Sequence, residues 1–300
     1  MNFKNLITGG IITMLCSIAS AVQNVTVHWP YGIGDPVVTI LRAILDKANQ
    51  SQIQYNFIII AVPGAGGAIA ANKTLANKEL TLLATSSTFF IRPMLFSDSN
   101  YNFDDFKPSL VMFSAPFALI AKQDFDETRL RKNSSLSLGI AGLGSTTHII
   151  GEKIKESYPN LLIVPYKSLV DSLADLKGGQ INLSLDLIRH AEEQYDTKIL
   201  GITGNKKIKN YKLFNNLGIA DIELAGSDVF IVRPRTMNAA VSTQLDSILL
   251  QASSDNQTLD KLYKENSAIP YLFQTQSQKD EWYRSQIQSM KSLTKNINLN

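Results

Sequence analysis

The sequence predicts an α/β protein of two lobes, each built from a sheet flanked by helices. Short runs rich in β-branched residues alternate with longer runs of helical periodicity, which is the pattern of βαβ units. The chain has 300 residues, 44% of them hydrophobic, so it can form two packed lobes of ordinary domain size. One predicted strand leaves the first group of elements near the middle of the chain, and a later strand returns to it.

The first 21 residues have the order of a secretory signal peptide: a polar head with Lys4, an apolar run at 6–18 and small residues ending at Ala21. The apolar run is shorter than the roughly 20 residues that a membrane-spanning helix needs. We therefore expect cleavage near Ala21 and export of the mature protein. The only cysteine, Cys16, lies inside this segment, so the mature protein would have no thiol for disulfides, catalysis or metal binding.

The first lobe is expected to comprise residues 22–115 and 233–300. The elements expected in its first part, in chain order, are a strand at 25–29, a helix ending near 48, a strand at 55–62, an Ala-rich helix ending near 77 and a strand at 80–84. This βαβαβ order predicts a parallel sheet covered by helices. In its second part, helices are expected over most of 238–263 and at 277–293.

The second lobe is expected to comprise residues 116–232. A strand at 112–122 leaves the first sheet, and a strand at 229–232 returns to it. Between them, the elements expected in chain order are strands at 137–141, 161–165, 181–185 and 198–203, with helices at 146–158 and 168–177. Two crossings between α/β lobes form a hinge beside a cleft. Ligands of open α/β sheets bind beyond the carboxyl ends of the strands, so we expect the site in this cleft.

Glycine-rich turns and hydroxyl side chains follow the predicted strands where the cleft should lie. Glycines let backbone N–H groups face an anion, and hydroxyls at a helix start donate to an anion or cap the helix. Ser145 and Thr146 are candidates for holding a carboxylate, Lys167 for supplying a cation, and Asp186 for accepting an amine or capping a helix. The residues expected to bind the ligand are Tyr31, Gly32, Ile33, Gly34, Ser86, Ser87, Thr88, Gly142, Gly144, Ser145, Thr146, His148, Tyr166, Lys167 and Asp186. The alternative is that these turns serve packing and capping, with Lys167 a solvated surface charge.

Other chemistries lack the residues that they need. The turn at 63–69 is no dinucleotide fingerprint, because Ile69 stands where a small residue is required, and it has no Gly-Lys-Thr of a phosphate loop. Ser145 and His148 form no hydrolase site, since the nucleophile elbow and a third group are missing. The three histidines are not at metal-ligand spacing, and His190 is expected at the surface. A net charge of +3 with scattered basic residues does not favour nucleic acid, so we expect no enzyme, cofactor, metal or nucleic-acid partner.

Taken in order, these motifs resemble those of the TctC or Bug family of periplasmic solute-binding proteins. The matching segments are the Gly-rich opening loop at 29–35 with Arg42, the Pro-Gly-Ala-Gly-Gly turn and Ala-rich helix at 63–76, the Tyr-to-Pro segment at 101–108, the Gly-x-Gly-Ser-x-x-His turn at 142–148 and the Val-Pro-Tyr-Lys stretch at 164–182. The set covers nearly the whole mature chain. The sequence departs from the family pattern at Ile33, at Asn182 and across 212–222, departures that concern the ligand more than the fold.

The resemblance implies a type II periplasmic-binding-protein fold, in which two lobes close like a Venus flytrap on a ligand between them. It implies a small carboxylate, such as a dicarboxylate, a tricarboxylate or an acidic amino acid, held partly through bridging waters. It also implies delivery to the membrane permease subunits of a tripartite tricarboxylate-type transporter, and we expect the binding protein to be a monomer. The alternatives are a binding protein that reports its ligand to a sensor and, less favoured, an exported enzyme.

Overall fold

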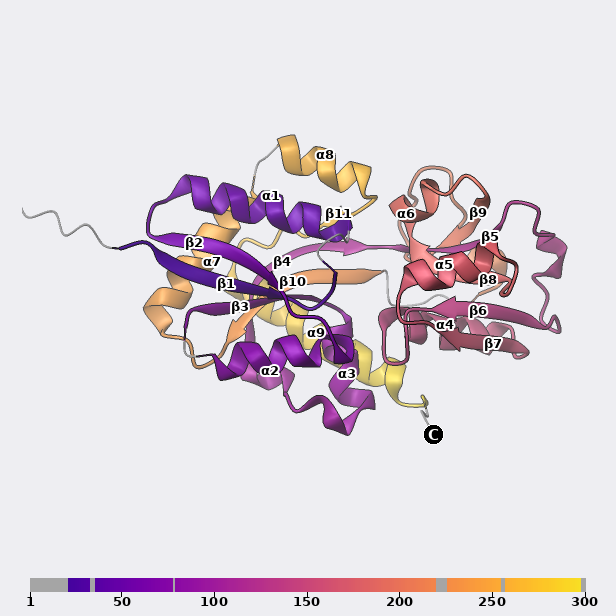
Figure 1. The fold of residues 1–300 in the computed structure, drawn as a ribbon, viewed down its shortest axis with the longest axis horizontal. Coiled ribbons are helices and arrows are strands. Elements are labelled where there is room, and N and C mark those ends of the chain that lie inside the picture. Colours follow the sequence, from indigo (N-terminus) through magenta and orange to yellow (C-terminus); the bar gives the residue numbers. More distant parts are fainter. Residues whose placement is uncertain (1–20, 33–35, 78, 220–225, 255–256, 298–300) are drawn as a thin grey trace, which may run out of the picture.

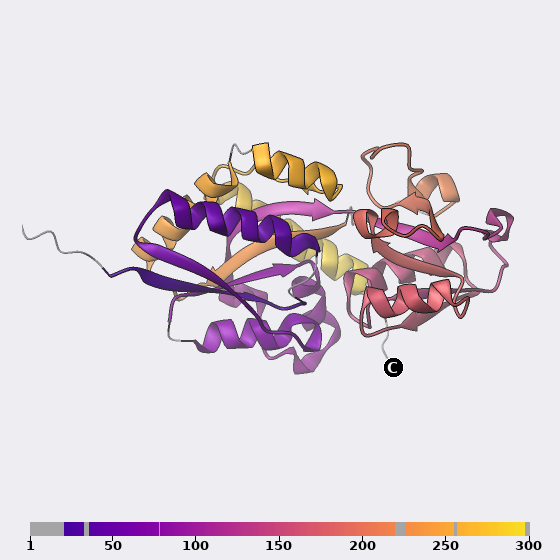
Figure 2. The same cartoon turned by 45° about the horizontal axis from the view of Figure 1, so that its top comes forward.

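The computed structural model describes residues 21–32, 36–77, 79–219, 226–254 and 257–297. Two β-sheets, each covered by helices on both faces, lie along the long axis of the molecule (Figure 1). The lobes are joined at a waist through which strands pass from one sheet to the other, as the turned view also shows (Figure 2). This arrangement confirms the predicted two-lobed α/β class.

The sheet of the first lobe has the strand order β11-β4-β10-β3-β1-β2. The strands are β1 (Gln23–Trp29), β2 (Tyr55–Ala61), β3 (Thr81–Ser86), β4 (Phe106–Ala115), β10 (Ser227–Pro234) and β11 (Ile269–Pro270). As predicted, β1 runs parallel to β2 and β3, whereas β10 runs antiparallel to both β3 and β4. The sheet is mixed rather than parallel, because β4 leaves this lobe and β10 returns to it in the opposite direction.

The helices of the first lobe pack against both faces of this sheet. They are α1 (Pro36–Ser51), α2 (Ala68–Ala76), α3 (Thr88–Leu95), α7 (Ala239–Ser253), α8 (Gln257–Glu265) and α9 (Gln276–Thr294), with short 3-10 helices η1 (Ala65–Gly67), η2 (Ser97–Ser99) and η3 (Phe103–Asp105). α1, α7 and α8 contribute to the core on one face, and α2, α3 and α9 to the core on the other. In α1, Ile40, Leu41, Ile44 and Leu45 are all buried, which is the spacing of a helix with one apolar face.

The sheet of the second lobe has the strand order β7-β6-β8-β5-β9. The strands are β5 (Phe117–Lys122), β6 (Leu136–Ile140), β7 (Leu161–Pro165), β8 (Leu183–Leu187) and β9 (Thr197–Ile202), and the helices are α4 (Thr146–Ser157), α5 (Leu169–Lys177), α6 (Ile188–Glu192), η4 (Glu127–Arg129) and η5 (Phe214–Leu217). β6 is parallel to β7 and β8, and β5 is antiparallel to β8 and β9. α4 packs on one face of this sheet, and α5 and α6 pack on the other.

The crossings between the lobes differ in detail from the expectation. The strand expected at 112–122 is two strands, because Pro116 separates β4 from β5 and has no N–H group for a continuous ladder. β10 pairs with β4 from Ser227 to Pro234. Residues 227–232, expected in the second lobe, therefore belong to the first sheet, and the other expected lobe boundaries stay predictions.

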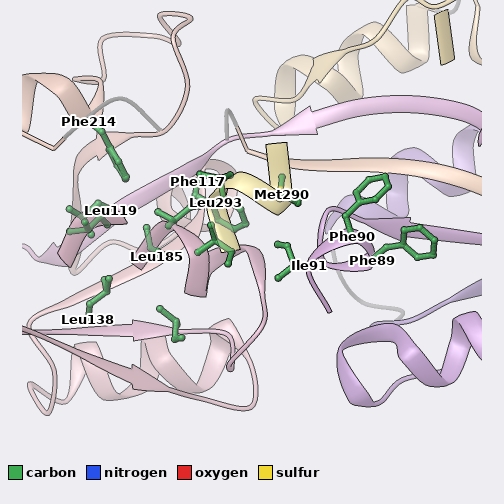
Figure 3. Packing of buried hydrophobic residues seen from close by; sticks show 14 of the residues in the cluster. Phe89, Phe90, Ile91, Phe117, Leu119, Leu138, Leu185, Phe214, Met290 and Leu293 are labelled. Atoms are coloured by element: carbon green, nitrogen blue, oxygen red, sulfur yellow. The ribbon is translucent and has the colours of Figure 1, made fainter. Parts of the chain in front are cut away.

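An apolar core continues from one lobe to the other along α9. The last turns of α9 bring Met290 and Leu293 into the same buried cluster as Phe117 and Leu185 of the second lobe (Figure 3). The lobes are therefore joined by packed side chains as well as by the crossing strands. None of the helices within the described ranges is long and apolar enough to cross a membrane.

Candidate functional site

A cavity of about 940 Å³ lies between the two lobes. Its walls are formed by the residues that follow β1, β2 and β3 in the first lobe, by those that follow β6 and β7 in the second lobe, and by the end of β8. In both lobes these are carboxyl ends of parallel strands, where α/β proteins bind their ligands. The cavity thus lies where the strand order places a cleft.

The wall contributed by the first lobe combines aromatic and hydroxyl groups. The Tyr31 hydroxyl and the Ser86 Oγ are 2.6 Å apart, a hydrogen bond that holds both at the cavity surface. The Tyr31 ring lies edge-on to Trp29, with ring centroids 5.2 Å apart. Thr88, at the start of α3, adds a further hydroxyl to this wall. A polar ligand would therefore meet hydroxyl groups beside an aromatic surface.

The turn between β2 and α2 closes another side of the cavity. Gly64 and Gly66 line it, and both have a positive φ, which glycine adopts without strain. A side-chain carbon built on the neighbouring Gly67 would lie 3.3 Å from the Cβ of Pro30. The Pro-Gly-Ala-Gly-Gly motif thus supplies both the backbone shape of this turn and its close packing against the loop that follows β1.

The turn between β6 and α4 is held in shape by its own groups. Gly142 and Gly144 have φ values of 84° and 75°, and Ser145 is the N-cap of α4. The Ser145 hydroxyl donates to the Gly142 carbonyl at 2.8 Å and accepts from the His148 N–H at 3.1 Å. Because the hydroxyl hydrogen is already used within the turn, Ser145 acts here as a cap, the alternative to a ligand donor.

His148 lies behind this turn rather than on the cavity wall. Its Nδ1 accepts a hydrogen bond from the Gly144 N–H at 3.2 Å, and its Nε2 is 3.5 Å from the Glu152 Oε1. Burial lowers the pKa of the imidazole, with Glu152 opposing the shift, so the neutral ring is favoured. A neutral ring that carries its proton on Nε2 suits both contacts. The expected ligand contact of His148 is therefore corrected to a role in holding the turn.

The first turn of α4 lies at the cavity wall. Thr146 and Thr147 line it and occupy the first two helical positions, where N–H groups have no acceptor within the helix. The Thr146 hydroxyl is 3.5 Å from the Thr88 hydroxyl of the opposite lobe. The partial positive charge at a helix N-terminus adds to these donors. This corner of the cavity can therefore hold a carboxylate without a full counter-charge.

The second lobe also places charged side chains at the cavity. Asp186, almost completely buried, lies within β8 rather than after it. Its Oδ1 accepts from the Leu187 N–H and its Oδ2 from the His190 Nδ1, both at 2.7 Å. The Tyr166 hydroxyl is turned toward Asp175, to which it donates at 2.8 Å. Lys167, in contrast, is exposed at the cavity rim, where it can attract anions.

Most of the expected site residues lie on the cavity wall. Those that line it are Tyr31, Gly32, Ser86, Thr88, Gly142, Gly144, Ser145, Thr146, Tyr166, Lys167 and Asp186. Ser87 does not line it, because its buried hydroxyl accepts from the Asp228 N–H at 2.9 Å. Ile33 and Gly34 lie outside the described residues. Which of the lining residues contact a ligand stays a prediction.

Several lining residues were not among those expected from the sequence. They include Pro63, Gly64, Phe117, His190, Glu193 and Val229. Phe117 and Val229 lie beside the crossings, so only the sheet topology brings them to the cavity. His190 was expected at the surface, but its position four residues after Asp186 was a usable signal for their contact. Among the described residues no group of three or more potential metal ligands occurs.

Known structures share this architecture. Periplasmic binding protein BugD is similar with a TM-score of 0.77 at 19% identity, over 91% of this chain and 97% of BugD. MatC from Rhodopseudomonas palustris, solved with bound malate, has a TM-score of 0.74 at 18% identity, over 91% of this chain and 99% of its own. A further R. palustris protein, solved with adipate, has a TM-score of 0.77 at 20% identity, over 91% of this chain and 96% of its own. The chain thus has the fold of a periplasmic binding protein, with two lobes.

Sequence comparison gives the family. The family described as "Tripartite tricarboxylate transporter family receptor", TctC, matches residues 40–299. A relative is the UPF0065 protein in the TAR-I ttuE-ttuC' intergenic region of Agrobacterium vitis, 22% identical over 255 residues, which are 79% of this chain and 73% of the relative. The chain belongs to the TctC family of periplasmic solute-binding proteins, which confirms the resemblance in its motifs.

Proposed function

We propose that this protein captures a small carboxylate in the cavity between its lobes and delivers it to a tripartite tricarboxylate-type transporter. The observation that carries the proposal is the first turn of α4, where Thr146 and Thr147 line the cavity at helical positions whose amides have no acceptor within the helix. Two proteins of similar fold were solved with malate and with adipate, which supports a carboxylate as the ligand class. The segment at 1–21 would direct export and be removed near Ala21, leaving a periplasmic monomer.

The donors at α4 have the strength that this role needs. A hydrogen bond from a neutral donor to a carboxylate contributes about 1.5–3 kcal/mol, so two or three of them offset much of the cost of association, about 4–15 kcal/mol. The nearby Asp186 would not exclude a carboxylate where His190 is protonated, because the imidazolium 2.7 Å from its Oδ2 then balances its charge. A second polar group of the ligand would face the hydroxyls of Tyr31 and Ser86.

The proposal is tested by thermal unfolding of the mature protein with mono-, di- and tricarboxylates and acidic amino acids, each beside its uncharged amide. A ligand at a hundredfold excess over its Kd raises the free energy of unfolding by about 2.7 kcal/mol. We expect at least one carboxylate to raise the transition temperature and its amide to have no effect. Thr146→Val keeps the side-chain shape without the hydroxyl and should weaken binding about tenfold. No shift across the panel, or equal shifts by the amides, contradicts the proposal.

A further inference from the structure

We propose that Phe96, which belongs to the first lobe and does not line the cavity, is a positioning residue that holds the binding turn of the second lobe in shape. The binding turn is the segment 142–147, which follows β6 and includes the first two residues of α4. The expected effect on ligand affinity rests on the proposed function, whereas the contact itself is observed in the structure.

The ring of Phe96, which follows α3, lies directly on Gly144. A side-chain carbon built on Gly144 would overlap the Cε2 of this ring and lie 3.2 Å from its Cδ2 and 3.4 Å from its Cζ. Gly144 also has a positive φ of 75°, so two independent reasons require glycine there. At the other end of α3, the Thr88 hydroxyl is 3.5 Å from the Thr146 hydroxyl. The segment 88–96 therefore meets the binding turn at two points.

Phe96 is itself held by a side chain from α3. The Arg92 guanidinium lies 3.8 Å from the centroid of the Phe96 ring, a cation–π contact. The Nη2 of Arg92 donates to the Asp98 Oδ1 at 3.0 Å, and only 13% of the Arg92 side chain is exposed. Asp98 thus holds Arg92, Arg92 lies over the Phe96 ring, and the ring lies on Gly144. These contacts restrict the rotamers available to the ring.

Gly144 is also held by a group of its own lobe. Its N–H donates to the buried Nδ1 of His148, so the glycine contacts an aromatic ring from one lobe and an imidazole from the other. Rotation of its peptide would lose the hydrogen bond to His148 and disturb the contact with the ring. Gly144 is directly followed by Ser145 and the first amides of α4, so its backbone angles help to set the direction of the proposed carboxylate donors. Phe96 therefore acts on the ligand through the turn.

The test compares Phe96→Ala with Phe96→Leu, which keeps an apolar contact, and with Phe103→Ala as a matched control. Phe103 is another half-buried phenylalanine of the first lobe, and its carbonyl accepts from Tyr283 of the same lobe. Amide hydrogen exchange of 141–148 is measured without ligand, and affinity is measured with a carboxylate that binds the wild type. We expect Phe96→Ala to speed exchange at Gly144 and to weaken affinity, each by about tenfold. Phe96→Leu should stay within about threefold of wild type, and Phe103→Ala should change neither quantity.

A double variant separates this contact from a general loss of stability. In the wild type, Gly144→Ala adds a carbon that overlaps the ring, whereas with Phe96→Ala only the strain of the positive φ remains. The loss of affinity caused by Gly144→Ala should therefore be smaller in the Phe96→Ala background. Unchanged exchange at Gly144 in Phe96→Ala, or equal losses in the two backgrounds, overturns the proposal. If no carboxylate binds the wild type, the proposed function fails, and the exchange measurement alone decides whether Phe96 positions the turn.

Discussion

Replacement of Asp228 by asparagine should stabilise the protein at neutral pH and remove a pH dependence of its stability. Asp228 is the second residue of β10, beside the crossing between the lobes, and it is 5% exposed. Burial raises the pKa of its carboxyl to about 6, although the Tyr271 hydroxyl donates to its Oδ1 at 2.9 Å. The charged form is therefore disfavoured in the folded protein, and an uncharged amide of the same shape removes that penalty.

The size of the effect follows from the linkage between protonation and folding. An aspartate in an unfolded chain has a pKa of about 3.9, so the folded protein binds this proton more tightly by about two pH units, or ~3 kcal/mol. Between about pH 4 and pH 6 the folded state holds more protons than the unfolded state, so the contribution of Asp228 to stability falls as pH rises and is lowest above about pH 6. We expect Asp228→Asn to raise the free energy of unfolding by about 1–3 kcal/mol at neutral pH, less where the amide fits Tyr271 poorly.

Urea unfolding of the wild type and the variant, at several pH values between about 4.5 and 7.5, measures this difference directly, because the other titrating groups are common to both proteins. The difference should shrink toward zero at the acidic end. Asp246→Asn is the control: it removes an ion pair with Arg233 at 3.2 Å and should lower stability instead. A difference between wild type and Asp228→Asn that stays constant over this range would refute the raised pKa of Asp228.

Two further substitutions test helix capping and packing in the second lobe. Ser145→Ala removes the N-cap of α4 and should lower the free energy of unfolding of the ligand-free protein by about 1 kcal/mol; unchanged stability would show that the cap contributes nothing. Gly139→Ala places a carbon on β6 that overlaps the Ser172 Oγ and lies 2.7 Å from the Ile181 Cδ1. It should therefore lower the free energy of unfolding by about 1–3 kcal/mol. Gly151→Ala in α4 is the control, because its new carbon would come no closer than 3.4 Å to a neighbour. It should leave the free energy of unfolding unchanged or raise it. Equal losses of stability for Gly139→Ala and Gly151→Ala would contradict the packing argument.

The sequence pattern predicts the elements whose periodicity is strong and misses those that are short. The strand expected at 161–165 is β7 itself, and the helix expected at 146–158 is α4 to within one residue. α3 and α6 were not predicted, because α3 has eight residues with Pro93 among them and α6 has five, too few for a periodic pattern. The prediction of a parallel sheet in the first lobe was only partly right. The direction of β10 depends on the chain's return from the other lobe, which no local pattern encodes.

The sequence predicts which turns line the cavity, but it does not predict the contacts that their side chains make. Glycines and hydroxyls after the predicted strands pointed to the turn at 142–147, which lines the cavity, because strand ends converge in any α/β lobe. They did not show whether the Ser145 hydroxyl caps α4 or faces a ligand, since one residue type at the N-cap serves both purposes. The direction of the His148 ring depends on burial behind the turn. Phe96 meets Gly144 only because the two lobes lie against each other, so the sequence around either residue carries no sign of the contact.

The packing of α9 against both lobes restricts how one lobe can turn relative to the other. Two bodies joined at two points can still rotate about the line through those points, and a third contact away from that line must slide during the rotation. The crossings supply the two points, and the end of α9 supplies the third. Met290 of α9 is an unbranched side chain, which can adapt to a moving neighbour. A rotation of one lobe against the other about the two crossings would therefore have to slide the buried contact at the last helix of the chain.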